Sequence, residues 1–148
     1  MIWCCEAFAE LGVARLYALL RLRAEVFVVE QRCFYVDADG LDPQCLHLSA
    51  WQNDAPQAYA RLVPPGVKAE RPCIGRVLTA PSARGTGLGH ELARRAVQAC
   101  EAQWPGQGIT LYAQAHLRGY YERHGFQAVG DVFDEDGIPH LRMDKDAA

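Results

Sequence analysis

The apolar residues of this 148-residue chain recur with two different periods, and each period predicts one kind of element. Short alternating or continuous apolar runs predict strands, whereas a spacing of three and four residues predicts amphipathic helices. The predicted strands cover residues 2–8, 46–51, 57–63, 73–79, 109–113, 126–132 and 138–143. The predicted helices cover residues 12–31, 88–100 and 117–124.

The resulting order, β-α-β-β-β-α-β-α-β-β, predicts an α/β (α+β) fold with a mixed central sheet flanked by helices. The strand, helix and strand of residues 73–113 form a predicted right-handed parallel βαβ unit, and ligands bind such units at the carboxyl edge of the first strand. The length of 148 residues fits a single domain, residues 1–148.

A glycine-rich turn, Arg84-Gly85-Thr86-Gly87-Leu88-Gly89, joins the strand and the helix of this unit. The start of a helix exposes unpaired N–H groups and partial positive charge, and glycine lets a phosphate approach the backbone closely. The turn lacks the lysine of a P-loop, and His90 stands where a dinucleotide fingerprint needs its third glycine. The turn therefore predicts a site for some other phosphate compound.

The composition of the chain mainly argues against several classes of protein. A net charge of -3 with scattered arginines gives no electrostatic argument for nucleic acid, and no apolar run is long enough to span a membrane. The first residues do not read as a signal peptide, so we expect a cytoplasmic location. The six cysteines and five histidines fit no disulfide framework and no metal motif, so no metal is predicted.

Two stretches resemble one enzyme family. Arg84-x-x-Gly87-x-Gly89 resembles the acetyl-coenzyme A signature [QR]-x-x-G-x-[GA] of the GCN5-related N-acetyltransferases (GNAT). Downstream, Gln114-x-x-Leu117-x-x-Tyr120-Tyr121-x-x-x-Gly125-Phe126 is similar to the family pattern N-x-x-A-x-x-L-Y-x-x-x-G-F. Glutamine replaces the usual asparagine, leucine the alanine, and tyrosine the aliphatic residue. The first change keeps an amide, and the other two alter packing bulk.

The resemblance extends over nearly the whole chain to one subgroup, the ElaA-like acetyltransferases. It is carried by residues 16–20, 25–31 and 114–117 and by the tail 135–140. The chain departs from the subgroup at Phe34, where proline is usual, which puts the shape of the following acidic loop in doubt. The subgroup adds no defined acceptor.

The resemblance implies acetyl-CoA as cosubstrate and no metal. It implies that the main chain of Gly85, Thr86, Gly87 and Gly89 binds the pyrophosphate, with Arg84 adding charge. The main chain of Leu78 and Thr79 would pair with the pantetheine amides as an added strand, and the Gln114 amide would hold the pantetheine arm or a water. An N–H at the end of this strand would also donate to the thioester oxygen.

Proton transfer needs an acid and a base. Tyr121 is the candidate acid for the departing thiolate, and the alternative is a core tyrosine; Tyr120 points elsewhere on the helix and is expected to pack. Glu30 is the first candidate base and His140 the second, with His47 and His116 also open. Three carboxylates, Asp37, Asp39 and Asp42, would favour a cationic acceptor if they point inward; the alternative is a solvated acidic loop.

Two functions therefore remain. The first is an acetyl-CoA-dependent N-acetyltransferase acting on a small-molecule amine or a protein amine, and the second is a non-catalytic acyl-CoA-binding or regulatory module with the same fold. The identity of the acceptor, the length of the acyl group and the oligomeric state, including a homodimer, stay open.

Overall fold

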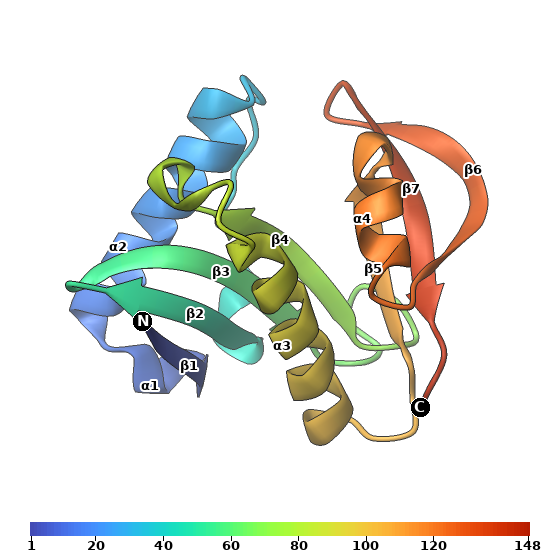
Figure 1. Ribbon diagram of the computed structural model, residues 1–148, viewed down its shortest axis with the longest axis horizontal. Coiled ribbons are helices and arrows are strands. Elements are labelled where there is room, and N and C mark those ends of the chain that lie inside the picture. Colours follow the sequence, from blue (N-terminus) through green and yellow to red (C-terminus); the bar gives the residue numbers. More distant parts are fainter.

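The computed structural model describes residues Met1–Ala148 and has one seven-stranded mixed sheet with the strand order β1-β2-β3-β4-β5-β7-β6 (Figure 1). The strands are β1 (Ile2–Ala7), β2 (Leu46–Gln52), β3 (Ala55–Val63), β4 (Cys73–Thr79), β5 (Ile109–Gln114), β6 (Gln127–Glu135) and β7 (Ile138–Lys145). The helices are α1 (Phe8–Leu11), α2 (Val13–Arg23), α3 (Leu88–Gln103) and α4 (Arg118–Glu122). The predicted fold class and element order are confirmed. None of the helices has the length and apolar character needed to cross a membrane.

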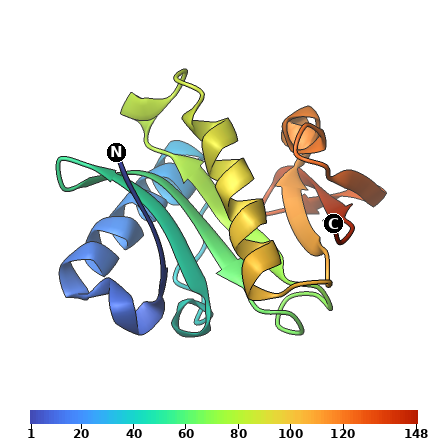
Figure 2. The same cartoon turned by 60° about the horizontal axis from the view of Figure 1, so that its bottom comes forward.

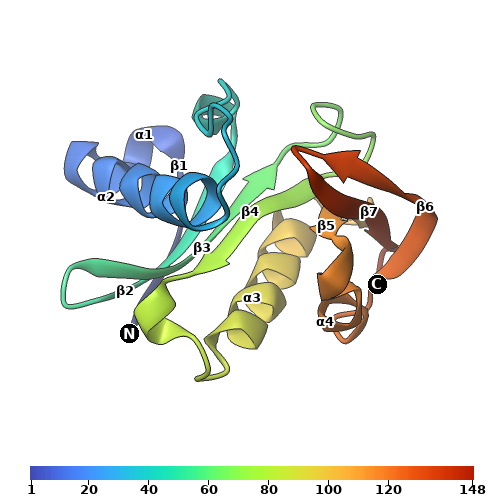
Figure 3. The ribbon, with the colours of Figure 1, turned by 90° about the horizontal axis from the view of Figure 1, so that it is seen from above.

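The helices cover the two faces of the sheet. Helices α1 and α2 lie on one face, and α3 and α4 lie on the other (Figure 3). Helix α3 runs over β3 and β4, which it contacts (Figure 2), and its buried stripe includes Leu88, Leu92, Ala96 and Cys100. Each fully buried leucine contributes about 2 kcal/mol of hydrophobic stabilisation. This packing fixes where α3 begins relative to the end of β4.

Strands β4 and β5 separate along their length. They are parallel, and the only paired residues are Cys73 and Thr110, at the start of each strand. Beyond this pair the strands diverge toward their carboxyl ends, and the two halves of the sheet form a V (Figure 1). The divergence leaves one side of β4 without a strand partner, next to the glycine-rich turn.

A β-bulge interrupts β4 on its other side. Tyr59 pairs with Leu78 and Arg61 pairs with Gly75, so that Arg76 and Val77 together oppose a single residue of β3. Arg76 has a φ of 50°, which side chains other than glycine adopt at a cost. A bulge leaves main-chain groups unpaired and re-aims the strand.

The predicted helix 12–31 is not one α-helix. After α2 ends at Arg23, the chain continues as a π-helical turn, Ala24–Glu30, with a bond from Gln31 N–H to the Val26 carbonyl of 3.2 Å. The apolar spacing that predicted the helix does not distinguish α from π winding, because both bury one face. The wider turn ends with Gln31 facing the gap between β4 and β5.

Both predictions for the acidic loop of Asp37, Asp39 and Asp42 are wrong. Its carboxylates do not face solvent as a group, and they do not line an acceptor site. They form ion pairs with three arginines of α2, β3 and β4: Arg23 with Asp37 and Asp42, Arg61 with Asp39 and Asp42, and Arg76 with Asp37 and Asp39. Arg23 and Arg61 are almost fully buried. Six opposite charges thus fasten the loop to the sheet, and none of these carboxylates remains for a cationic acceptor.

The C-terminal hairpin has a shorter connection than the gap between the predicted strands 126–132 and 138–143. Its turn has only two residues, Asp136-Gly137, with φ angles of 53° and 79°. Positive φ at both central residues, with the Asp-Gly pair, is typical of a type I′ turn. Glu135 is therefore the last residue of β6.

Candidate functional site

The glycine-rich turn has the backbone that an anion site needs. Gly85 and Gly87 have φ angles of 80° and 81°, and Gly87 is the N-cap residue of α3 with no side-chain cap hydrogen bond. Nothing lies within 4 Å of the Cβ position at either glycine, so the turn is open. The Thr86 hydroxyl donates to the Ala83 carbonyl at 2.7 Å and braces the turn. The uncapped N–H groups of α3 and the open turn suit a phosphate group.

Arg84 lies beside this turn, but its guanidinium is paired. Its Nη2 and Nη1 atoms donate to the two carboxylate oxygens of Glu30 at 2.8 and 3.1 Å. Both side chains are more than two fifths exposed, at 44% and 42%. Glu30 is absent from the cavity described below, so the geometry does not support it as the first candidate base. Glu30 instead forms an ion pair with Arg84.

The unpaired side of β4 offers main-chain groups to a ligand. The Ala80 N–H donates to the Gln57 carbonyl at 2.8 Å, which directs Ala80 toward β3. Since backbone groups alternate sides along a strand, Leu78 also points toward β3, and Thr79 points into the gap. The geometry thus favours Thr79 over Leu78 for pairing with an added strand.

Gly89 lies against Tyr120. A Cβ atom at Gly89 would lie 3.7 Å from the Tyr120 hydroxyl, which donates to the Gly89 carbonyl. Burial raises the pKa of Tyr120 to about 12. Tyr120 is thus a packing residue that fastens α4 to the start of α3, as predicted.

Tyr121 lies on the other side of α4, toward the gap. Its side chain is buried, and its ring meets the edges of Tyr120 and Phe126 at centroid distances of 4.8 and 6.1 Å. The turn that follows α4 ends at Gly125, whose φ of 91° lets Phe126 N–H return to the Tyr121 carbonyl at 3.2 Å. Burial, with a smaller effect of Tyr120, raises the pKa of Tyr121 well above its usual range. The phenol therefore stays protonated at neutral pH.

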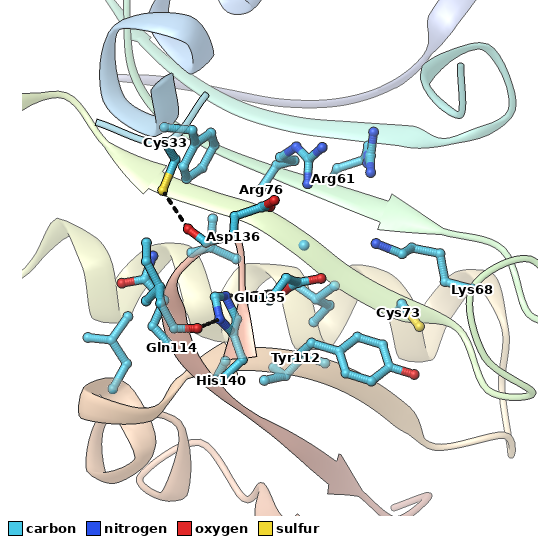
Figure 4. Close-up of a pocket in the computed structure, with 18 of the residues that line it drawn as sticks. Cys33, Arg61, Lys68, Cys73, Arg76, Tyr112, Gln114, Glu135, Asp136 and His140 are labelled. Atoms are coloured by element: carbon cyan, nitrogen blue, oxygen red, sulfur yellow. Dashed lines mark hydrogen bonds and ion pairs between the residues drawn. The ribbon is translucent and has the colours of Figure 1, made fainter. Parts of the chain in front are cut away.

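A cavity of about 270 Å³ occupies the gap between β4 and β5, and Tyr121 is part of its wall. Figure 4 shows the side chains that line this cavity, with strand β4 above and the β6–β7 hairpin below. Its polar and charged lining residues include Gln31, Lys68, Arg76, Tyr112, Gln114, Glu135, Asp136 and His140. The cavity is thus lined by residues that lie far apart in the sequence, at the end of a helix, in the sheet and in the hairpin.

Gln114 and His140 share one end of this cavity. They are directly opposite each other in the antiparallel β5–β7 pair, so their side chains lie on the same face of the sheet. The Gln114 amide nitrogen donates to the Gln31 side-chain oxygen at 3.3 Å. The predicted cofactor residue Gln114 and the second candidate base, His140, are therefore brought together with Tyr121.

The hydrogen bonds of His140 define the role of each ring nitrogen. Nδ1 lies 2.7 Å from the Ile138 carbonyl oxygen, which can only accept, so Nδ1 carries a proton. In the neutral ring Nε2 then carries the lone pair, and it lies 3.3 Å from a carboxylate oxygen of Glu135. Because a carboxylate only accepts, Glu135 can form a hydrogen bond with Nε2 only when that nitrogen also carries a proton.

The other two candidate bases do not reach the cavity. His47 is buried, with Nε2 2.9 Å from the Asp42 carbonyl and Nδ1 2.6 Å from the Tyr59 hydroxyl. Burial lowers the pKa of His47, and both nitrogens are already bonded. His116 is exposed and is not a lining residue. No group of three or more metal-ligating side chains is found in the structure.

Sequence reasoning missed five charged residues of the cavity: Arg61 and Arg76, which pair with the acidic loop, and Lys68, Glu135 and Asp136, which do not. Lys68 lies in the loop between β3 and β4, and the two carboxylates lie at the β6–β7 turn. The Asp136-Gly137 pair was the signal for a tight hairpin, and a tight hairpin would have placed Glu135 on the strand. Nothing local in the sequence indicates that Lys68 faces the same space.

The whole fold, with the divergent β4–β5 pair and the open glycine-rich turn at a helix start, matches solved structures of GNAT acyltransferases. Residues 21–147 match the family model described as an acetyltransferase (GNAT) domain, and the chain belongs to this family.

The similarity to individual proteins covers nearly the whole chain. The ElaA protein of Escherichia coli is 44% identical over 137 residues, which are 91% of this chain and 90% of ElaA. Its crystal structure matches with a TM-score of 0.93 over 98% of this chain and 99% of that one. An acyl-CoA N-acyltransferase from Pseudomonas aeruginosa matches with a TM-score of 0.93, 48% identity and the same coverage. The predicted relationship to the ElaA-like proteins is confirmed.

A more distant structure shares the fold alone. An aminoglycoside 6′-N-acetyltransferase complexed with coenzyme A matches with a TM-score of 0.72 at 16% identity, over 99% of this chain and 97% of that chain.

Proposed function

We propose that this protein is an acetyl-CoA-dependent N-acetyltransferase that transfers the acetyl group directly to an amine. The observation that carries the proposal is the meeting of Tyr121 and His140 in one cavity, between strands that leave the β4 main chain open. The relatives support the donor, since one solved structure of the same fold contains coenzyme A and another is named an acyl-CoA N-acyltransferase.

The donor would bind along the open side of β4 and the turn. The N–H groups of Gly85 to Gly89 would hold the pyrophosphate, with Arg84 beside it once Glu30 has released the guanidinium. Thr79 would pair with the pantetheine amides, and Gln114 would hold the arm or a bridging water. Main-chain N–H at the Arg76–Val77 bulge is the donor we assign to the thioester oxygen, where negative charge develops.

The cavity supplies both proton transfers. Nε2 of His140 would accept the proton of the attacking amine, and Glu135 would stabilise the resulting imidazolium. The amine nitrogen bonds to the thioester carbon, the C–S bond breaks, and the Tyr121 hydroxyl gives its proton to the departing sulfur. Burial raises the proton affinity of a thiolate as well as that of the phenol, so the two pKa values move in the same direction and the transfer stays feasible.

Two further parts of the proposal follow from the same observations. All six cysteines are free thiols, which suits a reducing compartment and supports a cytoplasmic location. The alternative function, a non-catalytic acyl-CoA-binding module, would give no reason for an acid and a base to face one cavity. It remains the second candidate because the fold itself would suffice for binding.

The test is thiol release from acetyl-CoA across a panel of amines. Tyr121→Phe should lower kcat about a hundredfold with little effect on the KM for acetyl-CoA, because only the hydroxyl is lost. His140→Gln should lower kcat as well, and Tyr120→Phe serves as the control for loss of a phenol outside the cavity. If Tyr121→Phe left turnover unchanged, Tyr121 would not be the general acid. Tight coenzyme A binding without amine-stimulated release would favour the binding module.

A further inference from the structure

The cavity carries charges of both signs that do not neutralise each other. Every lysine and arginine of the chain forms an ion pair with a carboxylate except Arg32, Lys68 and Arg123. Of these three, only Lys68 lines the cavity. Its ammonium group is therefore a cation without a protein partner, directed into the same space as Tyr121 and His140.

The carboxylates of the cavity come from the opposite wall. Glu135 and Asp136 project from the β6–β7 hairpin, and the only ionic partner of either is His140, next to Glu135. Figure 4 shows Lys68 reaching in from the β3–β4 loop, and Glu135 and Asp136 entering from the hairpin. The two arginines of the lining, Arg61 and Arg76, are already held by the acidic loop.

The two ends of the cavity differ in chemistry as well as in charge. The hairpin end also contains Gln114, the proposed contact of the pantetheine arm, and His140, the proposed base. The end at Lys68 is the closed base of the V, where Cys73 pairs with Thr110 and where Tyr112 packs. A ligand that reaches from one end to the other would meet carboxylates at its reacting end and an ammonium group at its far end.

From this separation we propose that the acceptor is a small amino acid-like zwitterion, whose amine lies at Glu135 and His140 and whose carboxylate binds Lys68. The inference rests on the proposed N-acetyl transfer and specifies its acceptor. A cavity of about 270 Å³ is smaller than the roughly 300–1,000 Å³ of sites for drug-sized ligands, and it would also hold the thioester end of the donor, so the acceptor has to be small. Lys68 is a specificity residue in this account and takes no part in the bond-making step.

The test compares amines that differ only at the far end. γ-Aminobutyrate, butylamine and putrescine have the same carbon chain and the same reacting amine but end in a carboxylate, a methyl group and an ammonium group. Shorter and longer ω-amino acids extend the series. With wild-type protein and acetyl-CoA, we expect kcat/KM for the preferred amino acid to exceed that of the matched alkylamine by about tenfold, because a charge-assisted hydrogen bond distinguishes them.

Lys68→Met should remove this preference by raising the KM for the amino acid while leaving the alkylamine nearly unchanged. Lys68→Arg should restore most of it, because the charge returns. Arg32→Met is the matched control, since it removes an exposed, unpaired cation that does not line the cavity. A preference for butylamine or putrescine, or a preference for the amino acid that survives Lys68→Met, would overturn the proposal while the acetyltransferase function stands.

A separate outcome concerns the function itself. If no amine stimulates thiol release, the proposed transfer fails, and calorimetry of the coenzyme A-loaded protein with the amino acid series then decides the binding claim. Binding heat that Lys68→Met abolishes and Arg32→Met keeps would support a zwitterion site. The absence of binding heat with every member of the series would overturn it.

Discussion

At the scale of single residues, a polar side chain can act in the site only if its polar atoms face the cavity and are not bonded elsewhere in the folded chain. Tyr120 and Tyr121 are adjacent, but the first donates to a carbonyl of α3 and the second faces the cavity. His47 and His140 are both largely buried, but His47 is bonded through its two nitrogens to Asp42 and Tyr59 away from the cavity, whereas His140 lines the cavity and meets Glu135 there. In each case the sequence predicted the type of residue. It did not predict which tyrosine or histidine faces the cavity, because that depends on partners elsewhere in the fold.

The Glu30–Arg84 pair leads to a prediction at this scale. Glu30→Gln should tighten coenzyme A binding by roughly twofold to fivefold, because it frees Arg84 and removes a negative charge near the phosphates. Calorimetric titration with coenzyme A measures the effect. Glu25→Gln is the control, because Glu25 is also exposed and paired with an arginine but lies one helical turn away.

Turnover of the Glu30→Gln variant separates the two roles considered for this residue. We expect kcat to stay within about twofold of wild type, since the cavity does not include Glu30. A collapse of kcat with unchanged coenzyme A binding would restore Glu30 as the base and contradict the assignment to His140.

At the scale of elements, the strand, turn and helix of residues 73–103 were the most predictable part of the molecule. The spacing of the glycines predicted the turn, and the period of the apolar residues predicted α3, because both patterns are local properties of the chain. The bulge at Arg76–Val77 was not predictable, since it depends on the register with β3. The π-helical end of α2 was missed for a similar reason, because its winding leaves no separate mark in the apolar period.

The two glycines around the start of α3 give a matched comparison. Gly87→Ala should destabilise the protein by about 1 kcal/mol and weaken coenzyme A binding, because alanine is strained at a φ of 81° and the helix start would shift. Gly89→Ala should change stability less, since its φ is not positive and the nearest atom to the new Cβ, at 3.7 Å, is an ordinary contact. Urea unfolding and coenzyme A titration measure both. Equal losses in the two variants would contradict the assigned conformational role of Gly87.

At the scale of the whole molecule, the long-range pairs were the part that sequence could not supply. The class of fold followed from the order of elements, and the family resemblance predicted a role for the glycine-rich turn. The acidic loop, however, could be read only as solvated or as facing a ligand, since its arginine partners lie on three other elements. Lys68 joined the site in the same way, through the closing of a loop.

The buried ion network predicts an acid dependence of stability. Burial opposes the ionisation of Asp42, but hydrogen bonds from Arg23 and Arg61 outweigh it and hold the pKa of Asp42 below its usual value. A carboxyl group with a lowered pKa in the folded state contributes its stability fully above the unfolded value of about 4 and loses it as the pH falls through the folded value. The unfolding free energy should therefore decline below about pH 4.

The matched variants are Asp42→Asn and Asp54→Asn. The first should cost about 3 kcal/mol at neutral pH, because it leaves two buried guanidinium groups with one carboxylate each, and it should flatten the acid decline. The second should be nearly neutral, since Asp54 is exposed in the β2–β3 turn. An Asp42→Asn protein as stable as wild type at neutral pH would show that the network does not hold the loop.

The most direct test of the central claim is a mass-spectrometric inventory of products after the wild-type protein is incubated with acetyl-CoA and an amine substrate. Direct transfer predicts equal amounts of N-acetylated amine and free coenzyme A, with no acetylated protein residue and no excess of acetate. Free coenzyme A accompanied by acetate and unmodified amine would show hydrolysis, and unchanged acetyl-CoA with every amine would show binding alone. Either result would contradict an N-acetyltransferase.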